Sequence, residues 1–280
     1  MSFEVVRHES PELSFEMVSR DSHPRLRGLV RDYIGYDERS REPLCRREVP
    51  SGDVHLILSP ASELTVGKAG AGSRHTSFVA ALHETHSLVE HDGRQHGIEV
   101  RLTPLGAYTL LGFPMDELSN RVVELDDLIG PRADELVGRL FESAAWHERF
   151  SLLDGLLAAR AEDGRGAAPG VAWAWRRLGE TSGRTSVRGL SEELGWSQRR
   201  LVARFREQIG LPPKALARIL RFERVSALLQ RVKGARLAEV AYDCGYFDQA
   251  HLNRDFREFA GTTPTAYIAA RLPPGGGVAG

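Results

Sequence analysis

The sequence predicts an α+β chain of two domains: a small N-terminal β-barrel or sandwich with packed helices, and a C-terminal all-α domain with two helix-turn-helix units. Short apolar runs separated by turn residues fill residues 53–102, and helical spacing dominates afterwards. Near the C-terminus, Phe205-Arg206-Glu207 recurs as Phe256-Arg257-Glu258, 51 positions later. A length of 280 residues suits two domains of ordinary size.

The predicted strands of the N-terminal domain are short and bounded by turn residues. Turn clusters at Lys68–Gly72 and Asp92-Gly93 separate them, a spacing typical of a small barrel or sandwich. Thr103 followed by Pro104 then predicts a helix that begins with a side-chain cap and ends at Gly112. The clearest strand candidates are Val54–Leu58, Ser77–Leu82 and Ile98–Leu102.

Apolar residues at helical spacing predict two further helices in this domain. The first carries Leu136 and Leu140, and the second carries Phe150, Leu153 and Leu157. We expect both helices to pack on the β-structure. Part of their apolar stripe could instead pair with a second copy of the chain, which would make the protein a homodimer.

A polar, glycine-rich segment without periodicity, Glu162–Gly170, predicts the linker between the domains. We place the first domain at residues 1–165, the linker at 166–170 and the second domain at 171–272. The proline- and glycine-rich end of the chain, residues 273–280, is expected to be a disordered tail.

Charge is distributed unevenly between the two domains. The net charge of the chain is only −1, but residues 184–272 contain 16 Lys and Arg against 9 Asp and Glu. This segment therefore carries +7, which leaves −8 for the rest of the chain. A basic C-terminal domain beside an acidic N-terminal one suggests that only the former binds a polyanion.

Two cysteines, Cys45 and Cys244, provide neither a disulfide framework nor a cysteine-rich zinc site. The chain contains no apolar run of about 18 residues, and its first residues lack the apolar core of a secretory signal. From these features we expect a reduced, cytoplasmic protein.

Each copy of the C-terminal repeat predicts a helix, a tight turn and a second helix. Gly195 and Gly245 suit the residue that ends the first helix of each copy, because glycine readily adopts a left-handed conformation. Ser197 and Asp248 follow as caps for the second helices. The buried stripes of these second helices are expected at Leu201, Phe205 and Ile209, and at Leu252, Phe256 and Phe259.

The segment between the two copies predicts a connecting helix that begins at Pro212-Pro213. Its roughly 19 residues would span about 28 Å, near the ~34 Å of one DNA turn. Two such units could therefore place their second helices in successive major grooves of double-stranded DNA. Arginine, asparagine and glutamine are the side chains that match guanine and adenine edges.

Residues Val171–Arg271 resemble the DNA-binding domain of the AraC/XylS family of bacterial transcription regulators. The segment Ala238–Arg257 is similar to the second helix-turn-helix of that family, and Gly261–Tyr267 is similar to its signature ending. The resemblance implies recognition helices at about Ser197–Gln208 and Asp248–Phe259, promoter DNA as a partner, and RNA polymerase as another if the protein activates. It implies base contacts at Gln198, Arg199, Val202 and Ala203, and at Gln249, Ala250, Asn253 and Arg254.

The first recognition helix departs from the family pattern. Where many members have an arginine that matches Arg254 of the second helix, this chain has Ala203. Arg204 follows one residue later, rotated by about 100° around the helix. We therefore expect Arg199 to carry more of the base reading, with Arg200 and Arg204 on phosphates or intramolecular acids.

The N-terminal domain resembles, less specifically, a sensor domain of AraC-like regulators. Thr103–Pro114, Glu117-Leu118 and Val122–Leu128 carry this similarity. It implies an effector-binding domain, a dimerisation domain, or both, with a small-molecule effector whose identity the resemblance does not give.

Five histidines crowd a short region, and imidazole is a common metal ligand. We expect no metal site, because His83 and His86 would lie on opposite faces of a strand and paired histidines two residues apart are missing. A metal-responsive regulator using these histidines is an alternative hypothesis. The five residues are His75, His83, His86, His91 and His96.

Catalytic motifs are missing from the sequence. It contains neither a Gly-x-Ser-x-Gly elbow nor a phosphate-binding Gly-x-x-x-x-Gly-Lys-Ser/Thr loop. We expect no catalytic residues and no cofactor. A further alternative is a small-molecule-binding or enzymatic barrel whose helical module binds a protein partner.

Overall fold

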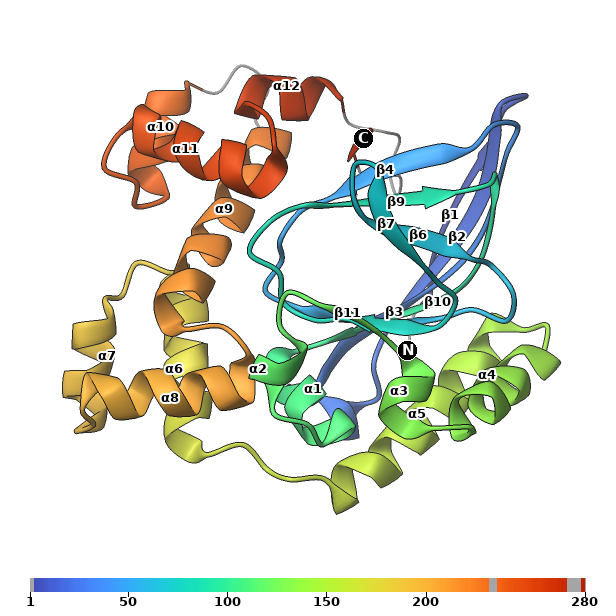
Figure 1. Cartoon of the computed structure of the whole chain (residues 1–280), viewed down its shortest axis with the longest axis horizontal. Helices are drawn as coiled ribbons and strands as arrows, with labels where there is room; N and C mark the ends of the chain where they lie inside the picture. The colour runs from blue at the N-terminus through green and yellow to red at the C-terminus, as the bar shows by residue number, and fades with distance from the viewer. Residues whose placement is uncertain (1–2, 232–235, 271–277, 280) are drawn as a thin grey trace.

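The computed structural model describes residues 3–231, 236–270 and 278–279, and it consists of a two-sheet β domain followed by helices (Figure 1). All strand pairs are antiparallel. The seven-stranded sheet has the order β1 (Glu4–Glu9), β2 (Leu13–Asp21), β3 (Val30–Ser40), β10 (Arg94–Leu102), β5 (Val54–Leu58), β8 (Phe78–Ala80) and β11 (Val122–Glu124). The five-stranded sheet has the order β12 (Val278–Ala279), β4 (Leu44–Glu48), β9 (Ser87–His91), β6 (Leu64–Lys68) and β7 (Ala71–His75).

The seven-stranded sheet has one apolar face and one mixed face. In β10, Ile98, Val100 and Leu102 are fully buried in the main core, while Gln95 and Glu99 face the opposite side. This follows from the two-residue period of a strand, which sends alternate side chains to opposite faces. The apolar face packs against the helices of the domain, and the mixed face turns toward the five-stranded sheet (Figure 1).

The two sheets form a sandwich and do not close into a barrel. The barrel alternative is therefore wrong, and the sandwich alternative is confirmed. Strand β8 is also shorter than the predicted run Ser77–Leu82, because the chain leaves the sheet after Ala80. A small apolar cluster lies between the sheets, formed by the buried side chains of Leu64, Val66 and Phe78.

The helices of the N-terminal domain follow the strands. The Thr103 hydroxyl accepts a hydrogen bond from Gly106 N at 2.9 Å, and Gly112 ends the first helix with φ of 81°, so the predicted limits are confirmed. The helices are α1 (Pro104–Leu111), α2 (Met115–Leu118), α3 (Leu125–Ile129), α4 (Arg132–Glu142) and α5 (Trp146–Asp163), with a short 3₁₀ turn at Pro24–Leu26.

Helix α5 is attached to the sheet by a buried polar contact. Asp154 accepts a hydrogen bond from the Tyr33 hydroxyl at 2.8 Å and pairs with Arg20. Phe150 stacks on Tyr33, with 5.5 Å between ring centroids. The predicted packing of this helix on the β-structure is confirmed.

The C-terminal domain contains the two predicted helix-turn-helix units. Ser197 Oγ accepts a hydrogen bond from Arg200 N at 3.2 Å, and Asp248 Oδ1 accepts one from His251 N at 2.6 Å, so both predicted caps are confirmed. The helices are α6 (Pro169–Glu180), α7 (Val187–Leu194), α8 (Gln198–Ile209), α9 (Pro213–Arg231), α10 (Leu237–Asp243), α11 (Gln249–Ala260) and α12 (Pro264–Ala269). Helices α7 and α8 form the first unit, α10 and α11 the second, and α9 joins them (Figure 1).

The expected linker and the expected tail can both be compared with the structure. Helix α5 ends at Asp163 and α6 begins at Pro169, around the expected linker. In the expected disordered tail, Val278 and Ala279 pair with Arg47 and Arg46 of β4, so the expectation is corrected for these two residues. Residues 271–277 and 280 lie outside the described residues.

None of the helices within the described ranges is long and apolar enough to cross a bilayer.

Candidate functional site

The first recognition helix, α8, buries one side and exposes the other. Leu201, Phe205 and Ile209 have no exposed surface and form its inner side. Val202 is half-buried. The exposed side carries predicted contact residues, namely Gln198, Arg199, Arg200, Ala203 and Arg204.

The arginines of α8 differ in how they are engaged. Arg204 Nη1 lies 2.7 Å from Glu207 Oε2, and the Arg200 guanidinium lies 4.4 Å from the centre of the Trp196 ring. Arg199 has no ion pair or hydrogen-bond partner for its side chain in the part of the chain that the structure describes. The intramolecular acid expected for Arg204 is therefore present. Among the described residues, Arg199 near the start of the helix and Arg206 in its last turn are the unengaged guanidinium groups.

The second recognition helix, α11, exposes Gln249, Ala250 and Arg254. Arg254, like Arg199, has no side-chain partner among residues 3–231 and 236–270. Asn253 is only half-buried, but its Oδ1 atom is shielded and has no hydrogen-bond partner among the same residues. The structure therefore brings three predicted contact residues of this helix to the surface and partly withdraws the fourth.

Helix α11 is fixed to α9 by a charged contact that the sequence analysis missed. Arg218 Nη2 lies 2.8 Å from Asp255 Oδ1 and 2.5 Å from Glu258 Oε2. The hydrogen bond to Arg218 lowers the pKa of Glu258. The Phe222 ring centre lies 4.8 Å from that of Phe256. Ionic and aromatic contacts together set the orientation of the second recognition helix.

The N-terminal domain contacts the C-terminal ends of both recognition helices. Gly210, which ends α8 with φ of 104°, lies so close to Ser119 that a Cβ atom would overlap the serine hydroxyl. At the end of α11, Arg47 Nη1 donates to Ala260 O at 2.9 Å, and a Cβ on Gly261 would lie 2.6 Å from His86 Cε1. Gly210 and Gly261 occupy equivalent positions of the 51-residue repeat.

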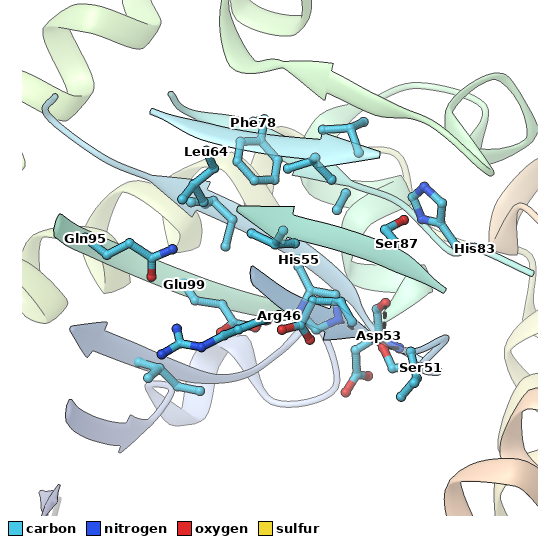
Figure 2. A pocket seen from close by; sticks show the side chains of 18 of the residues that line it. Arg46, Ser51, Asp53, His55, Leu64, Phe78, His83, Ser87, Gln95 and Glu99 are labelled. Atoms are coloured by element: carbon cyan, nitrogen blue, oxygen red, sulfur yellow. Dashed lines mark hydrogen bonds and ion pairs between the residues drawn. The ribbon is translucent and has the colours of Figure 1, made fainter. Parts of the chain in front are cut away.

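A cavity of about 410 Å³ lies between the two sheets of the N-terminal domain (Figure 2). Apolar side chains such as Leu64 and Phe78 form one side of it. A row of polar side chains faces them, and it extends from Gln95 and Glu99 to Ser51 (Figure 2). Apolar walls with a few polar groups, in a volume of about 300–1,000 Å³, are typical of small-molecule sites.

His55 is the central polar side chain of the cavity wall. Its Nδ1 lies 2.6 Å from Glu99 Oε1, and its Nε2 lies 2.9 Å from Ser51 Oγ. Burial alone would lower the pKa of His55, but the hydrogen bond to Glu99 and its negative charge outweigh burial and raise this pKa. The sequence analysis missed this pair, although a histidine inside the apolar run Val54–Leu58 was a signal for it.

The five clustered histidines do not converge. His75 bonds Glu124, His91 lies 3.1 Å from Glu38, and His86 lies against Gly261. His83 and His86 lie in the loop between β8 and β9, so the expectation that they occupy a strand is wrong. Within residues 3–231, 236–270 and 278–279, no three His, Cys, Asp or Glu side chains are grouped to hold a metal ion.

Two family models match this chain, one in each domain. Residues 190–270 match a helix-turn-helix domain family, and residues 20–124 match a domain of unknown function, DUF6597. No curated protein matches the chain. The two capped units and the matched helix-turn-helix model define a DNA-binding transcription regulator. Residues 190–270 therefore carry a helix-turn-helix domain of the AraC type.

The chain is also similar to several solved structures at low sequence identity. ToxT from Vibrio cholerae O395 is 10% identical with a TM-score of 0.45, over 93% of this chain and 98% of that one. The C-terminal domain of AraT, a response regulator from Geobacillus stearothermophilus, is 21% identical with a TM-score of 0.36, over 38% and 89%. The AraC-like transcriptional activator CuxR is 13% identical with a TM-score of 0.34, over 82% and 87%.

Proposed function

We propose that this regulator binds a promoter site of two unequal half-sites, one read by α8 and the other by α11. The free guanidinium of Arg199 is the principal base reader of the first half-site. Gln249, Asn253 and Arg254 read the second. The two half-sites differ because Ala203 stands where the second helix has Arg254.

Phosphate contacts supply the register and much of the affinity in this proposal. Arg200 and Arg204 lie on the exposed side of α8, and each already has an intramolecular contact that orients it. Contacts of this kind add affinity that is independent of sequence and falls steeply with salt.

The inter-sheet cavity is the proposed binding site for a small-molecule effector. The observation that carries this proposal is a hydrogen bond of 2.9 Å from Gly52 N to Glu223 Oε1 of α9. Gly52 belongs to the β4–β5 loop, and its neighbours Ser51 and Asp53 line the cavity. The cavity wall is therefore one residue away from the helix that joins both recognition units.

An effector acts in this arrangement by favouring one position of the β4–β5 loop. It changes DNA affinity only if it binds the DNA-competent and incompetent states unequally. Since α9 contacts both α8 and α11, a shift of α9 changes the placement of the two recognition helices together.

Two further partners remain predictions. RNA polymerase is a partner if the protein activates transcription. A homodimer is the other; within its suggested stripe, Leu140 of α4 is buried inside the domain and Leu136 is half-buried. Sedimentation velocity of the full chain would measure the second.

Fluorescence anisotropy with the full chain tests the proposed function. The probe is a duplex from the DNA upstream of the protein's own gene, with a scrambled duplex beside it, across a salt series. We expect selective binding that weakens steeply with salt. Equal binding of both duplexes at every salt concentration contradicts sequence-specific regulation by this site.

Glu223→Ala tests the connection to the cavity in the same assay. We expect a changed affinity for the specific duplex, although Glu223 lies away from the exposed sides of α8 and α11. Glu180→Ala is the control, because Glu180 is exposed on α6 and, among the described residues, pairs only with Arg176. If both variants bind as the wild type does, the Gly52–Glu223 contact does not couple the domains.

A further inference from the structure

The cations that line the inter-sheet cavity are already paired with protein groups. Arg46 Nη2 donates to Glu38 Oε2, and the other oxygen of Glu38 lies 3.1 Å from His91 Nε2. Both ring nitrogens of His55 are engaged, one by Glu99 and the other by Ser51. A ligand anion would therefore have to displace a buried carboxylate from its partner, which is costly.

The cavity contains an acid without such a partner. Glu48, the last residue of β4, lines the cavity and makes no hydrogen bond or ion pair through its side chain within the described ranges. Four carboxylates line the cavity. Glu38 pairs with Arg46, Glu99 with His55 and Asp53 with Arg31, which leaves Glu48 as the one without a cation among the described residues. Glu48 is exposed at the end of β4, and desolvation together with the nearby charge of Glu99 raises its pKa.

Two further polar groups face the cavity without a full set of partners. Gln95 is only 8% exposed, lines the cavity, and makes no side-chain hydrogen bond to any residue that the structure describes. Its carboxamide points into the cavity from the same face of β10 as Glu99 (Figure 2). A carboxamide without a protein partner is free to bond a ligand through both its oxygen and its nitrogen.

His83 adds an acceptor to the cavity wall. Its Nδ1 lies 2.6 Å from the carbonyl oxygen of Ala81, which can only accept, so Nδ1 carries the proton. Burial lowers the pKa of His83 and favours the neutral ring. Its Nε2 is therefore an acceptor, which suits a ligand that donates hydrogen bonds.

We propose that the cavity binds a small molecule that carries a protonated amine on a compact apolar body. The ammonium group lies against Glu48 and Glu99, and the apolar body lies against Leu64 and Phe78 on the other side. Gln95 bonds a second polar group of the ligand. This assignment rests on the proposed function and specifies the chemical class of its effector.

Three probes of equal length test the charge preference: 4-phenylbutylamine, 4-phenylbutan-1-ol and 4-phenylbutanoate. Each is titrated into the full chain without DNA by isothermal calorimetry at neutral pH. We expect the amine to bind roughly tenfold tighter than the alcohol, as one charge-assisted hydrogen bond predicts. The carboxylate should bind least. Equal or tighter binding of the carboxylate, or no binding of the amine, overturns the proposal.

The variant Glu48→Gln tests whether Glu48 causes the preference for the amine over the alcohol. It keeps the size of the side chain and removes its charge, so the amine should lose its tenfold advantage while the alcohol binds as before. Glu90→Gln is the matched control, because Glu90 is exposed on β9 and does not line the cavity. A tenfold advantage that persists in Glu48→Gln shows that Glu48 does not hold the ammonium group.

The same probes distinguish a wrong ligand class from a wrong function. If the alcohol or the carboxylate binds best and changes the affinity for the upstream duplex, the sensor function stands and the amine assignment is wrong. If no probe binds, and filling the cavity with Ala80→Leu also leaves DNA affinity unchanged, the amine assignment and the proposed effector site are both wrong.

Discussion

The two domains use their interiors in opposite ways. In the C-terminal domain, aromatic rings fill the space between α9 and α11, with Phe222, Phe256 and Phe259 less than 2% exposed. In the N-terminal domain, the space between the sheets holds a cavity bordered by carboxylates. A filled interior fixes the orientation of the recognition helix, whereas a cavity with unpaired polar groups retains the capacity to bind.

Phe222→Ala sharpens this comparison with the largest expected effect. Removing a ring from the filled interior should cost about 3–5 kcal/mol of unfolding free energy, measured by urea denaturation. Phe78→Ala is the counterpart, because Phe78 already borders the cavity and loses fewer contacts. We expect a smaller loss there, and equal losses would show that the two interiors are equally packed.

Arg218→Met is expected to have the next largest effect. It keeps the apolar stem of the side chain but leaves Asp255, which is 3% exposed, without its cation. Breaking such a buried pair costs about 3–5 kcal/mol, measured by the same denaturation. Arg200→Met should change stability little, because Arg200 is exposed on α8. A small loss in Arg218→Met would mean that the aromatic contacts alone hold α11.

Arg254→Ala tests whether the recognition helix that the filled interior holds in place reads DNA bases. We expect specific DNA binding to weaken by about 1–3 kcal/mol, with a smaller loss on scrambled DNA, if Arg254 reads a base. Asn253→Ala should behave in the same way. Arg204→Ala should weaken both duplexes about equally, because Arg204 is expected on phosphates. Anisotropy titrations measure all three, and an equal loss on both duplexes in Arg254→Ala contradicts base reading.

Glu48→Gln gives the smallest expected effect and tests the cavity. The pKa of Glu48 is raised in the folded state, so the folded state binds more protons than the unfolded one and loses stability as pH rises through this region. The variant should therefore melt at a higher temperature than the wild type near pH 7.5. This gain should fade as the pH falls below the carboxyl pKa of the unfolded chain. Thermal melts at pH 7.5 and 4 measure it, and a gain that persists at pH 4 would have another cause.

The C-terminal domain was the more predictable of the two because its signals are local. Caps at Ser197 and Asp248 and turns at Gly195 and Gly245 depend on residues a few positions apart. The contact between Arg218 and Asp255 joins residues 37 positions apart, and no local pattern indicates it. The roles of individual residues in DNA contact remain predictions.

The N-terminal domain was less predictable because its arrangement depends on strand register. Barrel and sandwich have the same alternation along each strand, so the sequence could not separate them. The cavity residues left a weak signal: Gln95, Gly97 and Glu99 alternate on one face of β10 and make that face polar or open. What the sequence lacked was the strand order that brings Glu48 and Glu99 to the same cavity.

The glycines that end the two recognition helices hold each helix against the N-terminal domain at one end. Gly210 and Gly261 contact the N-terminal domain, while the residues expected to read bases lie at the opposite ends of α8 and α11. A helix of 12 residues is about 18 Å long, so a tilt of roughly 10° about its held end moves the other end by about 3 Å. Such a displacement exceeds the tolerance of a hydrogen bond to a base edge. If the N-terminal domain shifts on binding an effector, as proposed above, this geometry would amplify a small shift along both helices.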